Sequence, residues 1–574
     1  MGRRIDITRI PGYGRFESGT LKMMGLVELF FALALIFPTI VALHYGEDTV
    51  PFTLLIPILM VLGGIQLFLF RQSSSFRNAN GMLVVAAAWA FVFFVGMVPY
   101  VMAGMNPFDA VFESVSGFTT TGGTMLTDIE SWPKSILIWR SLTQWIGGIA
   151  VIIIFMYILP YLGVGRAILS NELSGSGANH FSLKMEKAAK SFILVYSFFS
   201  LIHLLILLLC RVDPFDALCL MFTTISTGGL MCTNNSLMGY SDVVQFITIV
   251  FMFLGGVNFY LHYRAIYYRD SSVHDLKNVR KSRGFYDFIV RDRRKKIEAM
   301  LPKRMKVYAS NSEFRFNLLW FVVTSLVCTI VILATTDMSG GFFHSLYQTF
   351  KNVLFTVVSL GTTTGYYVTD YTQWPEFVVA LLFLIALFGA SAGSTSGGIK
   401  LYRLRIAYGF LVNAVTRTLH PNAVYSVKTD NISIDQGQVL SALSIIMMYI
   451  ITMILGALIV MLYGYSIVDS FGLTVSAVAN GGLGFGMFGP TGSMGAIPDS
   501  LKLILSFLMW LGRLEILVAL VFLTPSFWKE IWLNRRTKHR LKKESRDYSE
   551  PQYVGDSAKS HGLIGVFNVL RRRK

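Results

Sequence analysis

The strongest constraint on the fold of this chain is a series of long apolar runs without charged side chains. Residues 51–70 and 82–103 contain no Asp, Glu, Lys or Arg. An α-helix of about 20 apolar residues is long enough to cross the hydrocarbon core of a bilayer. Only 14% of the 574 residues are charged, whereas about 25% is usual in soluble domains. The sequence therefore predicts an all-α polytopic membrane protein and excludes a soluble enzyme, a disordered chain and a fibrous protein.

Ten long apolar runs are predicted to span the membrane. They are residues 21–43, 51–70, 82–103, 136–159, 192–209, 243–263, 317–335, 377–399, 439–462 and 503–523. If the connections alternate from a cytoplasmic N-terminus, most of the 50 Lys and Arg residues fall on the inner side. The basic residues of the outer connections are then only Lys134, Arg211, Lys351 and Lys502. This positive-inside bias predicts that both termini are cytoplasmic.

The same bias explains the net charge of +17 without a nucleic-acid partner. The basic run at residues 291–306 is expected to face the membrane surface or a partner protein, because no aromatic-studded nucleic-acid-binding pattern surrounds it.

Four of the outer connections repeat one motif. Residues 106–125 (NPFDAVFESVSGFTTTGGTM) and 213–231 (DPFDALCLMFTTISTGGLM) share Pro-Phe-Asp near the start and Gly-Gly near the end. Residues 342–367 and 466–489 carry related patterns, and each of the four segments lies between two apolar runs. The predicted unit is a span, a short pore helix, a glycine-bearing loop and a second span. The first two spans precede the four units.

The short helices predict a cation site. A helix of about ten residues cannot cross the bilayer, and non-helical backbone at that depth is stable only when buried in protein or lining water. Asp109, Asp216 and Asp469 lie at the predicted helix starts, and His344 takes the comparable place in the third segment. The carboxyl ends of four such helices would direct carbonyl groups and partial negative charge toward one axis.

The candidate ion-binding residues are the small polar residues and glycines of the four loops. Glycine permits backbone angles that turn successive carbonyl groups toward an axis. A ring of carbonyl oxygens can replace the water shell of an alkali cation, and the absence of acids in the loops disfavours a divalent-selective carboxylate ring. The predicted ion-binding residues are Thr120, Thr121, Gly122, Thr227, Gly228, Thr364, Gly365, Asn480, Gly481 and Gly482.

Two features after the third loop are candidate gates. Residues 389–398, GASAGSTSGG, interrupt an apolar run with residues that do not favour a helix. A broken span either packs closely or lines a permeation path. The predicted gate loop comprises Gly393, Ser394, Thr395, Ser396, Gly397 and Gly398. Arg513 is the second candidate, because ionisable residues within spans are usually functional; a structural ion pair with another span is its alternative.

Other charged and reactive residues are expected to have ordinary roles. Arg140, near an outer helix end, is predicted to snorkel to the interface. Lys400, Arg403 and Arg405 are expected to face lipid headgroups or to anchor the helix that resumes there. Glu28 and Glu515 are the acidic residues within predicted spans, so the paired acids of a membrane-embedded hydrolase are not expected. The cysteines are predicted to be small packed residues rather than a disulfide or metal site, and they are Cys210, Cys219, Cys232 and Cys328.

Together the motifs resemble a known family. They are FTTTGGT (118–124), ISTGGL (225–230), TTTGYY (362–367), ANGGLGFG (479–486), FGASAGSTSGGIK (388–400), LHPNAVYSVK (419–428) and LGRLEIL (511–517). Over roughly residues 20–530 the chain resembles the Trk/Ktr/HKT superfamily of potassium transport proteins. The two extra N-terminal spans make it most similar to the bacterial TrkH/TrkG type.

This resemblance implies a K⁺-channel-like subunit of the bacterial cytoplasmic (inner) membrane that takes up K⁺. It implies a homodimer in which each chain encloses its own pore, and a TrkA-like cytoplasmic ring that binds nucleotides. NAD, ATP and ADP are expected only on that partner, and no covalently bound cofactor is expected. The filter glycines carried over are Gly122, Gly228, Gly365 and Gly482, and Arg513 is expected to obstruct the pore below them.

Glycine rather than serine at position 122 favours K⁺, by the same resemblance. A Na⁺ or poorly selective cation pathway is the alternative, and passive conduction and coupling to H⁺ or Na⁺ both stay open. The predicted organisation is a tail with two extra spans (1–78), pore repeats (79–165, 185–268, 313–412 with a broken second helix, and 436–526), a basic cytoplasmic loop (269–312) and a basic tail (527–574).

Overall fold

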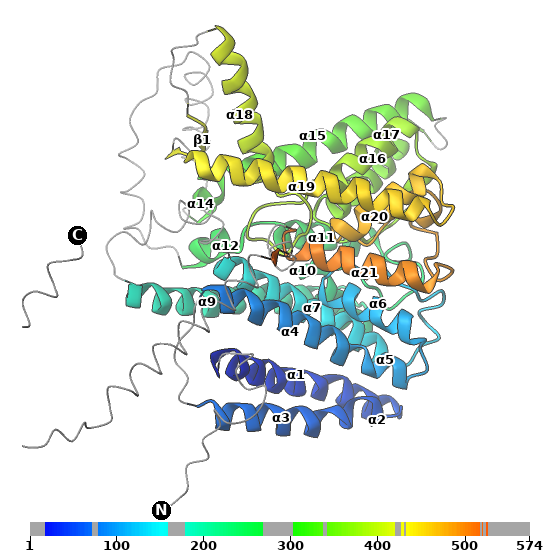
Figure 1. Cartoon of the computed structure of the whole chain (residues 1–574). Coiled ribbons are helices and arrows are strands. Elements are labelled where there is room, and N and C mark those ends of the chain that lie inside the picture. Colours follow the sequence, from blue (N-terminus) through cyan, green and yellow to red (C-terminus); the bar gives the residue numbers. More distant parts are fainter. Residues whose placement is uncertain are drawn as a thin grey trace, which may run out of the picture. The chain divides into compact units, whose positions relative to one another are not determined.

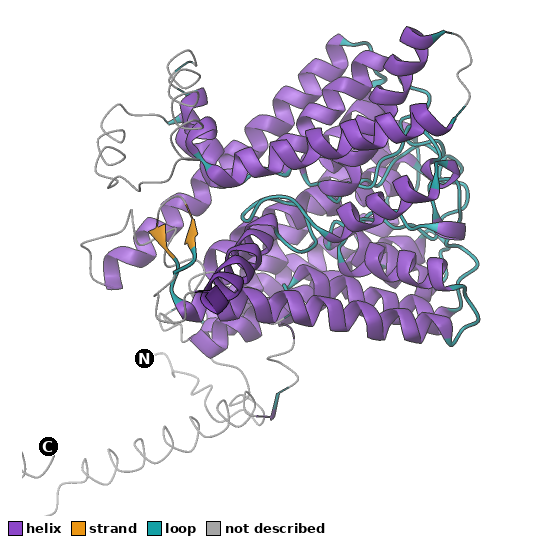
Figure 2. Ribbon diagram, turned by 90° about the horizontal axis from the view of Figure 1, so that it is seen from above, coloured by secondary structure: helices purple, strands orange, loops and turns teal. Residues whose placement is uncertain are grey.

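The computed structural model describes residues 18–71, 78–158, 178–267, 302, 304–336, 341–419, 426–429, 432–516, 519 and 524–525. The chain divides into two units, Met1–Leu520 and Val521–Lys574, and every helix and strand given below lies in the first. Within this unit the long helices lie roughly side by side (Figure 1), and non-helical segments run between them (Figure 2). Most of the predicted basic loop at 269–312 and all of the predicted tail at 527–574 lie outside the described residues.

The first helices form a hairpin. α1 (Ser18–Tyr45) packs along α3 (Leu55–Leu69), which follows the short α2 (Val50–Thr53). A Cβ atom on Gly63 would lie 2.8 Å from the Gly25 carbonyl oxygen, so small residues allow the two helices to approach closely. Gln66 donates a hydrogen bond of 2.8 Å to the Glu28 carboxylate, which gives this buried acid a polar partner.

Four groups of helices follow. The helix of each group that leads into a glycine-bearing loop is called re-entrant below, and these helices are Pro107–Phe118, Pro214–Ile225, Phe342–Gly361 and Ile467–Val478. The first contains α4 (Asn78–Gly96), α5 (Val98–Met102), α6 (Pro107–Phe118) and α7 (Lys134–Ile158). The second contains α9 (Ala178–Leu209), α10 (Pro214–Ile225), α11 (Asp242–Gly255) and α12 (Phe259–Ile266). The third contains α14 (Met305–Ser310), α15 (Ser312–Thr335), α16 (Phe342–Gly361), the 3-10 turn η4 (Tyr371–Gln373), α17 (Glu376–Leu387) and α18 (Leu401–Leu419). The fourth contains α19 (Gln436–Met461), α20 (Ile467–Val478), the 3-10 turn η5 (Gly486–Phe488) and α21 (Asp499–Arg513).

The structure is all-α apart from one small hairpin. The strands β1 (Lys428–Thr429) and β2 (Ile432–Ser433) pair antiparallel between α18 and α19. They lie within the predicted third-to-fourth connection and do not change the predicted fold class.

Side chains fix the starts of three re-entrant helices. Asn106, Asp213 and Ser466 accept backbone N–H groups of the first turn at 2.9–3.2 Å. The acids predicted at the starts, Asp109, Asp216 and Asp469, lie in the first turns of α6, α10 and α20. These three helices have 12 residues each. The re-entrant helix of the third group, α16, has 20 residues. His344 lies in its first turn, and no side chain caps its start.

Seven described helices are long and apolar enough to cross a membrane, or eight if α11 and α12 form one bent span. They correspond to eight of the ten predicted spans. The predicted span at 243–263 is bent by 99° between α11 and α12. The bend frees the carbonyl groups of Gly255 and Gly256, which accept hydrogen bonds from the backbone N–H groups of Thr395 (3.2 Å) and Ser391 (3.0 Å). Backbone N–H groups elsewhere in the protein therefore satisfy these two carbonyl groups, which have no helical partner and no water at this depth.

The two remaining predicted spans, 377–399 and 503–523, do not form continuous helices. The helix α17 stops at Leu387, and residues 388–400 are not helical. The helix α21 begins at Asp499 and ends at Arg513 after 15 residues. Glu515 then adopts a φ of 55°, and its N–H bonds back to the Gly512 carbonyl over 3.1 Å. This left-handed turn ends the helix.

The core surrounds the re-entrant helices. Phe31 of α1, Phe118 of α6 and Trp139 of α7 pack with ring centroids 5.5–6.1 Å apart. The last residues of α6, α10, α16 and α20 are buried, so all four helices end inside protein.

Candidate ion-conducting site

All four re-entrant helices end in the same hydrogen-bonded turn. In the first, Thr120 N–H donates to the Gly117 carbonyl over 3.0 Å, and Thr121 N–H donates to the Ser116 carbonyl over 2.9 Å. Equivalent pairs close α10, α16 and α20. Such a turn needs a residue with positive φ, which is usually glycine. Here the residues with positive φ are Thr120 (52°), Thr227 (52°), Thr363 (57°) and Asn480 (54°).

Threonine at positive φ is strained, because its β-branched side chain crowds the backbone. The same strained conformation occurs in three loops, and asparagine, which tolerates it better, takes the fourth position. Strain of this kind persists only where the surrounding structure holds it, and it is concentrated at functional sites.

Two residues further on, each loop has a glycine in the left-handed conformation. These glycines are Gly122 (87°), Gly229 (76°), Gly365 (85°) and Gly482 (74°). Gly228, which the resemblance groups with Gly122, Gly365 and Gly482, does not occupy this backbone position. Gly228 is equivalent to Thr121, because the Ser-Thr-Gly-Gly loop reaches its glycine pair one residue earlier after the helix end than Thr-Thr-Thr-Gly-Gly does.

The four loops contact one another in a closed ring. A Cβ atom on Gly122 would lie 1.9 Å from the Gly228 carbonyl oxygen, so no side chain fits there. A Cβ atom on Gly229 of the second loop would lie 1.9 Å from the Thr364 carbonyl oxygen of the third. A Cβ atom on Gly365 of the third loop would lie 2.6 Å from the Gly481 carbonyl oxygen of the fourth. A Cβ atom on Gly482 of the fourth loop would lie 2.4 Å from the Thr121 carbonyl oxygen of the first. Each loop thus presents a carbonyl oxygen to the glycine of the loop before it in the ring.

Residues 388–400 lie against this ring and are called the intramembrane loop below. The Thr395 hydroxyl lies 2.9 Å from the Ile225 carbonyl oxygen at the end of α10. Gly397 N–H donates to the Thr363 hydroxyl over 2.7 Å. A Cβ atom on Gly397 would lie 2.1 Å from the Ala479 carbonyl oxygen. The intramembrane loop therefore contacts the second, third and fourth repeats at the ends of their re-entrant helices.

Arg513 joins α21 to the intramembrane loop. Its side chain is buried, and Nη1 donates to the Thr395 carbonyl oxygen over 2.9 Å. Its Nε and Nη2 groups have no hydrogen-bond partner among the described residues. Within the part of the chain that the structure describes, Arg513 forms no ion pair, since the nearby Glu515 pairs with Arg403.

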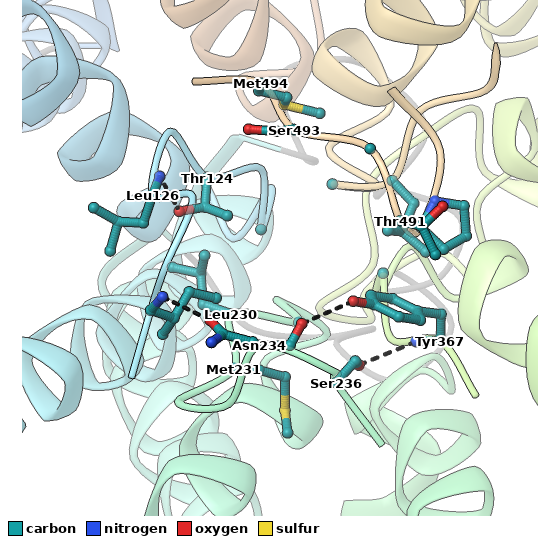
Figure 3. A pocket seen from close by; sticks show the side chains of 18 of the residues that line it. Thr124, Leu126, Leu230, Met231, Asn234, Ser236, Tyr367, Thr491, Ser493 and Met494 are labelled. Atoms are coloured by element: carbon teal, nitrogen blue, oxygen red, sulfur yellow. Dashed lines mark hydrogen bonds between the residues drawn. The ribbon is translucent and has the colours of Figure 1, made fainter. Parts of the chain in front are cut away.

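Beyond the four glycines the loops enclose a cavity of about 300 Å³ (Figure 3). Gly122, Gly229, Gly365 and Gly482 all line it. The Tyr367 hydroxyl donates to the Asn234 carbonyl over 3.0 Å, and Tyr367 N–H donates to the Ser236 hydroxyl over 3.2 Å. These bonds join the second and third loops. Polar groups and apolar side chains such as Leu126, Leu230 and Met494 line the cavity in about equal measure. Among the described residues, Arg140 is the charged residue of the lining and no carboxylate takes part in it.

The comparisons with known proteins agree on one family. The family model described as TrkH, Cation transport protein, matches residues 51–530. The chain belongs to the TrkH family. The Trk system potassium uptake protein TrkH of Vibrio parahaemolyticus is 29% identical over 518 residues, which cover 89% of this chain and 99% of the relative. The Trk system potassium uptake protein TrkG of Escherichia coli K12 is 27% identical, with 88% and 98% covered.

A solved structure supports the same assignment. The crystal structure of the potassium transporter TrkH from Vibrio parahaemolyticus matches with a TM-score of 0.75 and 27% sequence identity, over 89% of this chain and 99% of that chain. The predicted family and the predicted all-α membrane fold are confirmed. TrkH-family relatives are named as transport proteins, so this chain is a transport protein rather than an enzyme.

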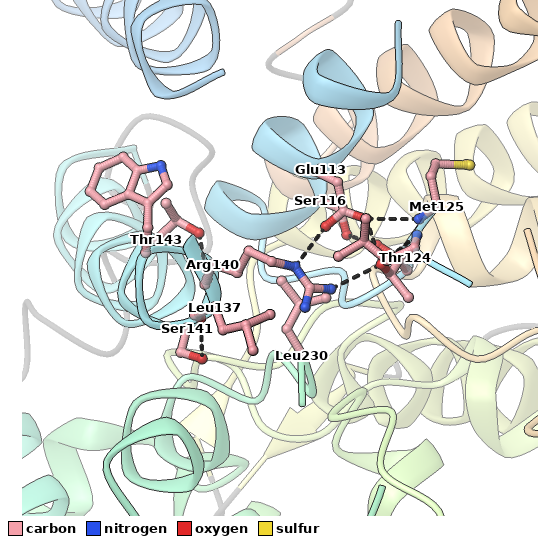
Figure 4. A network of polar contacts seen from close by, with 12 residues as sticks. Glu113, Ser116, Thr124, Met125, Leu137, Arg140, Ser141, Thr143 and Leu230 are labelled. Atoms are coloured by element: carbon pink, nitrogen blue, oxygen red, sulfur yellow. Dashed lines mark hydrogen bonds and ion pairs between the residues drawn. The ribbon is translucent and has the colours of Figure 1, made fainter. Parts of the chain in front are cut away.

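The TrkH-family chain contains a buried ion pair beside the first loop, which corrects the predicted snorkelling of Arg140 (Figure 4). Arg140 is 1% exposed, and its Nε lies 3.0 Å from Oε2 of Glu113, which is 0% exposed. Glu113 Oε1 accepts Met125 N–H at 2.7 Å, and Arg140 Nη2 donates to Thr124 Oγ1 over 2.9 Å. Arg140 Nη1 also donates to the Met231 carbonyl over 3.3 Å. The pair therefore ties α6 and α7 to the segments after the first two loops.

A disulfide in the second group of helices corrects the prediction that the cysteines are only packed thiols. Cys219 of α10 bonds to Cys232, with the two Cα atoms 6.5 Å apart, while Cys210 and Cys328 are free. The reversal of the chain at the second loop brings the pair together. In the sequence, a separation of 13 residues between two cysteines does not by itself indicate a disulfide.

The contacts of the basic residues after the intramembrane loop fit one of their two predicted roles, which is to anchor the helix that resumes there. Lys400 and Arg403 are buried, at 5% and 3% exposed. Lys400 Nζ donates to the Ser396 hydroxyl over 3.2 Å, and Arg403 pairs with Glu515. The Arg405 guanidinium donates to the Ser312 hydroxyl. Polar partners inside the protein therefore hold these cations, rather than lipid headgroups.

Sequence reasoning missed several residues of this site. Gly229 and Thr363 are found only when the loops are aligned on the ends of the re-entrant helices instead of on their glycine pairs. Glu113 carries a signal that could have been used, since it is an acid in the middle of a short helix whose other charged residue, Asp109, lies in the first turn.

Proposed function

We propose that this chain translocates K⁺ across the bacterial cytoplasmic membrane through the ring of four loops. The carbonyl oxygens around the ring replace the water shell of the dehydrated ion. The ion-binding residues of this proposal are Thr120, Thr121, Gly122, Thr227, Gly228, Thr364, Gly365, Asn480, Gly481 and Gly482, to which the shared backbone conformation adds Thr363 and Gly229.

One observation carries the proposal. Each loop presents a carbonyl oxygen next to the left-handed glycine of its neighbour, and the four contacts close a ring. Because α6, α10, α16 and α20 lead directly into these loops, the partial negative charges at their carboxyl ends add to the attraction for a cation.

The chemistry of the ring favours a monovalent ion. Its groups are carbonyl and hydroxyl oxygens, and the lining of the adjoining cavity holds no carboxylate that would suit a divalent cation. The TrkH and TrkG relatives are named as potassium uptake proteins, which favours K⁺ over Na⁺.

The intramembrane loop and Arg513 form the gate in this proposal. Gly393, Ser394, Thr395, Ser396, Gly397 and Gly398 obstruct the path on the side of the re-entrant helix ends. The hydrogen bond from Arg513 to Thr395 supports this role, because it places a buried positive charge against the loop that touches the ring. The intramembrane loop and Arg513 must both move before a cation can pass this point.

The proposal extends to the wider assembly that the family resemblance implies. The chain pairs as a homodimer with one pore in each protomer, and both termini are cytoplasmic. A TrkA-like ring on that side binds NAD, ATP or ADP and sets the position of the gate. The basic segment 269–312 is available to face this ring or anionic lipid. The predicted repeat boundaries 79–165, 185–268, 313–412 and 436–526 are retained in this scheme.

Ion flux into vesicles tests the proposal. The purified chain is reconstituted into proteoliposomes loaded with K⁺, and ⁸⁶Rb⁺ uptake is measured against protein-free vesicles. We expect uptake that external K⁺ suppresses at much lower concentration than Na⁺ does. Equal suppression by Na⁺ and K⁺ would indicate a poorly selective cation pathway, and uptake no greater than in protein-free vesicles would refute the proposed function.

A further inference from the structure

The four carbonyl groups at the contacts of the ring are not chemically equivalent. In the second loop Gly228 O accepts a hydrogen bond of 2.8 Å from Gln144 Nε2. In the fourth loop Gly481 O accepts Leu483 N–H at 2.9 Å. Among the described residues no hydrogen bond reaches the carbonyl oxygens of Thr121 and Thr364 in the first and third loops. Because the loops follow one another in order around the ring, the bonded and unbonded carbonyls alternate.

Gln144 of α7 is the side chain that creates this difference in the second loop. It is 0% exposed, so its amide has no water to satisfy it. Nε2 donates to Gly228 O, and Oε1 accepts Leu230 N–H at 3.1 Å. The amide therefore bridges the residues on both sides of the left-handed Gly229. A Cβ atom on Gly228 would lie 2.3 Å from the amide carbon of Gln144, so the two groups are in direct contact.

The second loop lacks the internal brace found in two other loops. Ser116 and Ser359, each two residues before a helix end, donate to the carbonyls of Gly123 (2.6 Å) and Tyr366 (2.7 Å) in their own loops. The equivalent residue in the second loop, Thr223, lies 2.5 Å from the Tyr366 hydroxyl instead. Gln144 thus bonds to the second loop from outside, at Gly228 O and Leu230 N–H. In the first and third loops the serine hydroxyls bond from within, to a carbonyl two residues after the one equivalent to Gly228 O.

We propose that Gln144 is a positioning residue for ion selectivity. A carbonyl oxygen has two lone pairs, so Gly228 O can accept the Gln144 amide and still face an ion. Held from behind, this carbonyl resists moving inward around an ion smaller than K⁺. Gln144 thereby disfavours Na⁺ at the ring without touching the ion. The inference rests on the proposed function, since it assigns the selectivity of the same ring.

The first test replaces Gln144 by leucine, which keeps the volume and removes both hydrogen bonds. The matched control is Gln245→Leu. Gln245 is also buried, and its Nε2 donates to the carbonyls of Leu237 (3.0 Å) and Tyr240 (3.1 Å), which lie outside the four loops of the ring. In the ⁸⁶Rb⁺ assay we expect Gln144→Leu to lower the preference for K⁺ over Na⁺ about tenfold, the size of one lost buried hydrogen bond. Gln245→Leu should keep the wild-type ratio.

The second test exchanges volume between the two residues in contact. Gly228→Ala places a methyl group against the Gln144 amide, so we expect uptake to fall about tenfold or more. Gln144→Ala in the same chain removes the obstructing amide, so the double variant should take up more ⁸⁶Rb⁺ than Gly228→Ala alone. This rescue does not require the Gln144 variants to be as stable as the wild type.

The outcomes separate the two proposals. Wild-type protein that transports no ⁸⁶Rb⁺ would overturn the proposed function itself. If the wild type transports K⁺ selectively but Gln144→Leu keeps the same K⁺/Na⁺ ratio, the role of Gln144 is refuted while the proposed function stands. A double variant no better than Gly228→Ala would also overturn the inferred contact.

Discussion

The guanidinium of Arg513 donates a hydrogen bond of 2.9 Å to the carbonyl oxygen of Thr395. Arg513 ends α21, whereas Thr395 lies in the intramembrane loop, and the Thr395 hydroxyl lies 2.9 Å from the Ile225 carbonyl oxygen at the end of α10. Two short contacts therefore connect a buried cation of the fourth repeat to the start of the second loop of the ring. A change in this connection should alter conduction even without any partner protein.

Removing the Arg513 side chain should open the path. For Arg513→Ala we expect basal ⁸⁶Rb⁺ efflux from proteoliposomes to rise about tenfold, because the charge that repels cations is lost and the intramembrane loop loses its hydrogen bond. Arg513→Lys keeps the positive charge, so basal efflux should rise less in this variant than in Arg513→Ala. Basal efflux equal to or below the wild-type value in Arg513→Ala would argue against a gate at this residue.

Adding one methyl group to the ring should stop transport. Gly229→Ala combines a positive φ of 76° with a Cβ atom 1.9 Å from the Thr364 carbonyl oxygen, so we expect uptake to fall at least tenfold. The control is Gly64→Ala, where no atom lies within 4 Å of the added group, and it should transport normally. Normal, K⁺-selective uptake by Gly229→Ala would contradict the assigned register.

Serine at the first or fourth glycine gives a graded test of the same ring. Gly122→Ser and Gly482→Ser add a side chain toward Gly228 O and Thr121 O respectively. We expect ⁸⁶Rb⁺ uptake to fall in both variants, and competition of K⁺ and Na⁺ for the uptake that remains should show a weaker preference for K⁺. Unchanged flux together with an unchanged preference would mean that these glycines do not form the selective site.

Neutralising Glu113 should destabilise the protein through its buried partner. Glu113→Gln leaves the positive charge of Arg140 without its carboxylate at 0–1% exposure, and breaking a buried pair in this way costs about 3–5 kcal/mol. We expect a lower thermal unfolding midpoint in detergent. The double variant Glu113→Gln/Arg140→Met should recover much of the loss, and a single variant as stable as the wild type would refute the pair.

Counting the free thiols tests for the disulfide directly. Denatured protein treated with an alkylating reagent without reductant should carry two labels, on Cys210 and Cys328, and four labels after reduction. Cys219→Ser should lower thermal stability by about 3 kcal/mol, as expected for a crosslink of this loop length, while Cys328→Ser serves as the control for removing a buried thiol. Four labels without reductant would show that Cys219 and Cys232 are not bonded.

Patterns within single segments predicted much of this fold. The long apolar runs predicted the spans that α1, α3, α7 and α9 form, because hydrophobic length decides which helices can cross a bilayer. The run of Gly and Ser after Leu387 predicted the interruption between α17 and α18, because few residues there favour a helix.

Features that depend on how distant segments meet could not be predicted in this way. The role of Gly229 depends on its distance from the end of α10, and glycine pairs look alike in sequence. The burial of Arg140 depends on Glu113, which lies 27 residues earlier. The bend after Gly255 is stable because Thr395, 140 residues later, supplies a partner for the freed carbonyl.

The position of a bound monovalent cation tests the central claim most directly. Crystals grown in Rb⁺ allow the ion to be located by its anomalous scattering. We predict a peak enclosed by the carbonyl oxygens of Thr121, Gly228, Thr364 and Gly481. Protein that transports Rb⁺ but shows its Rb⁺ peaks only outside these four loops would contradict the account.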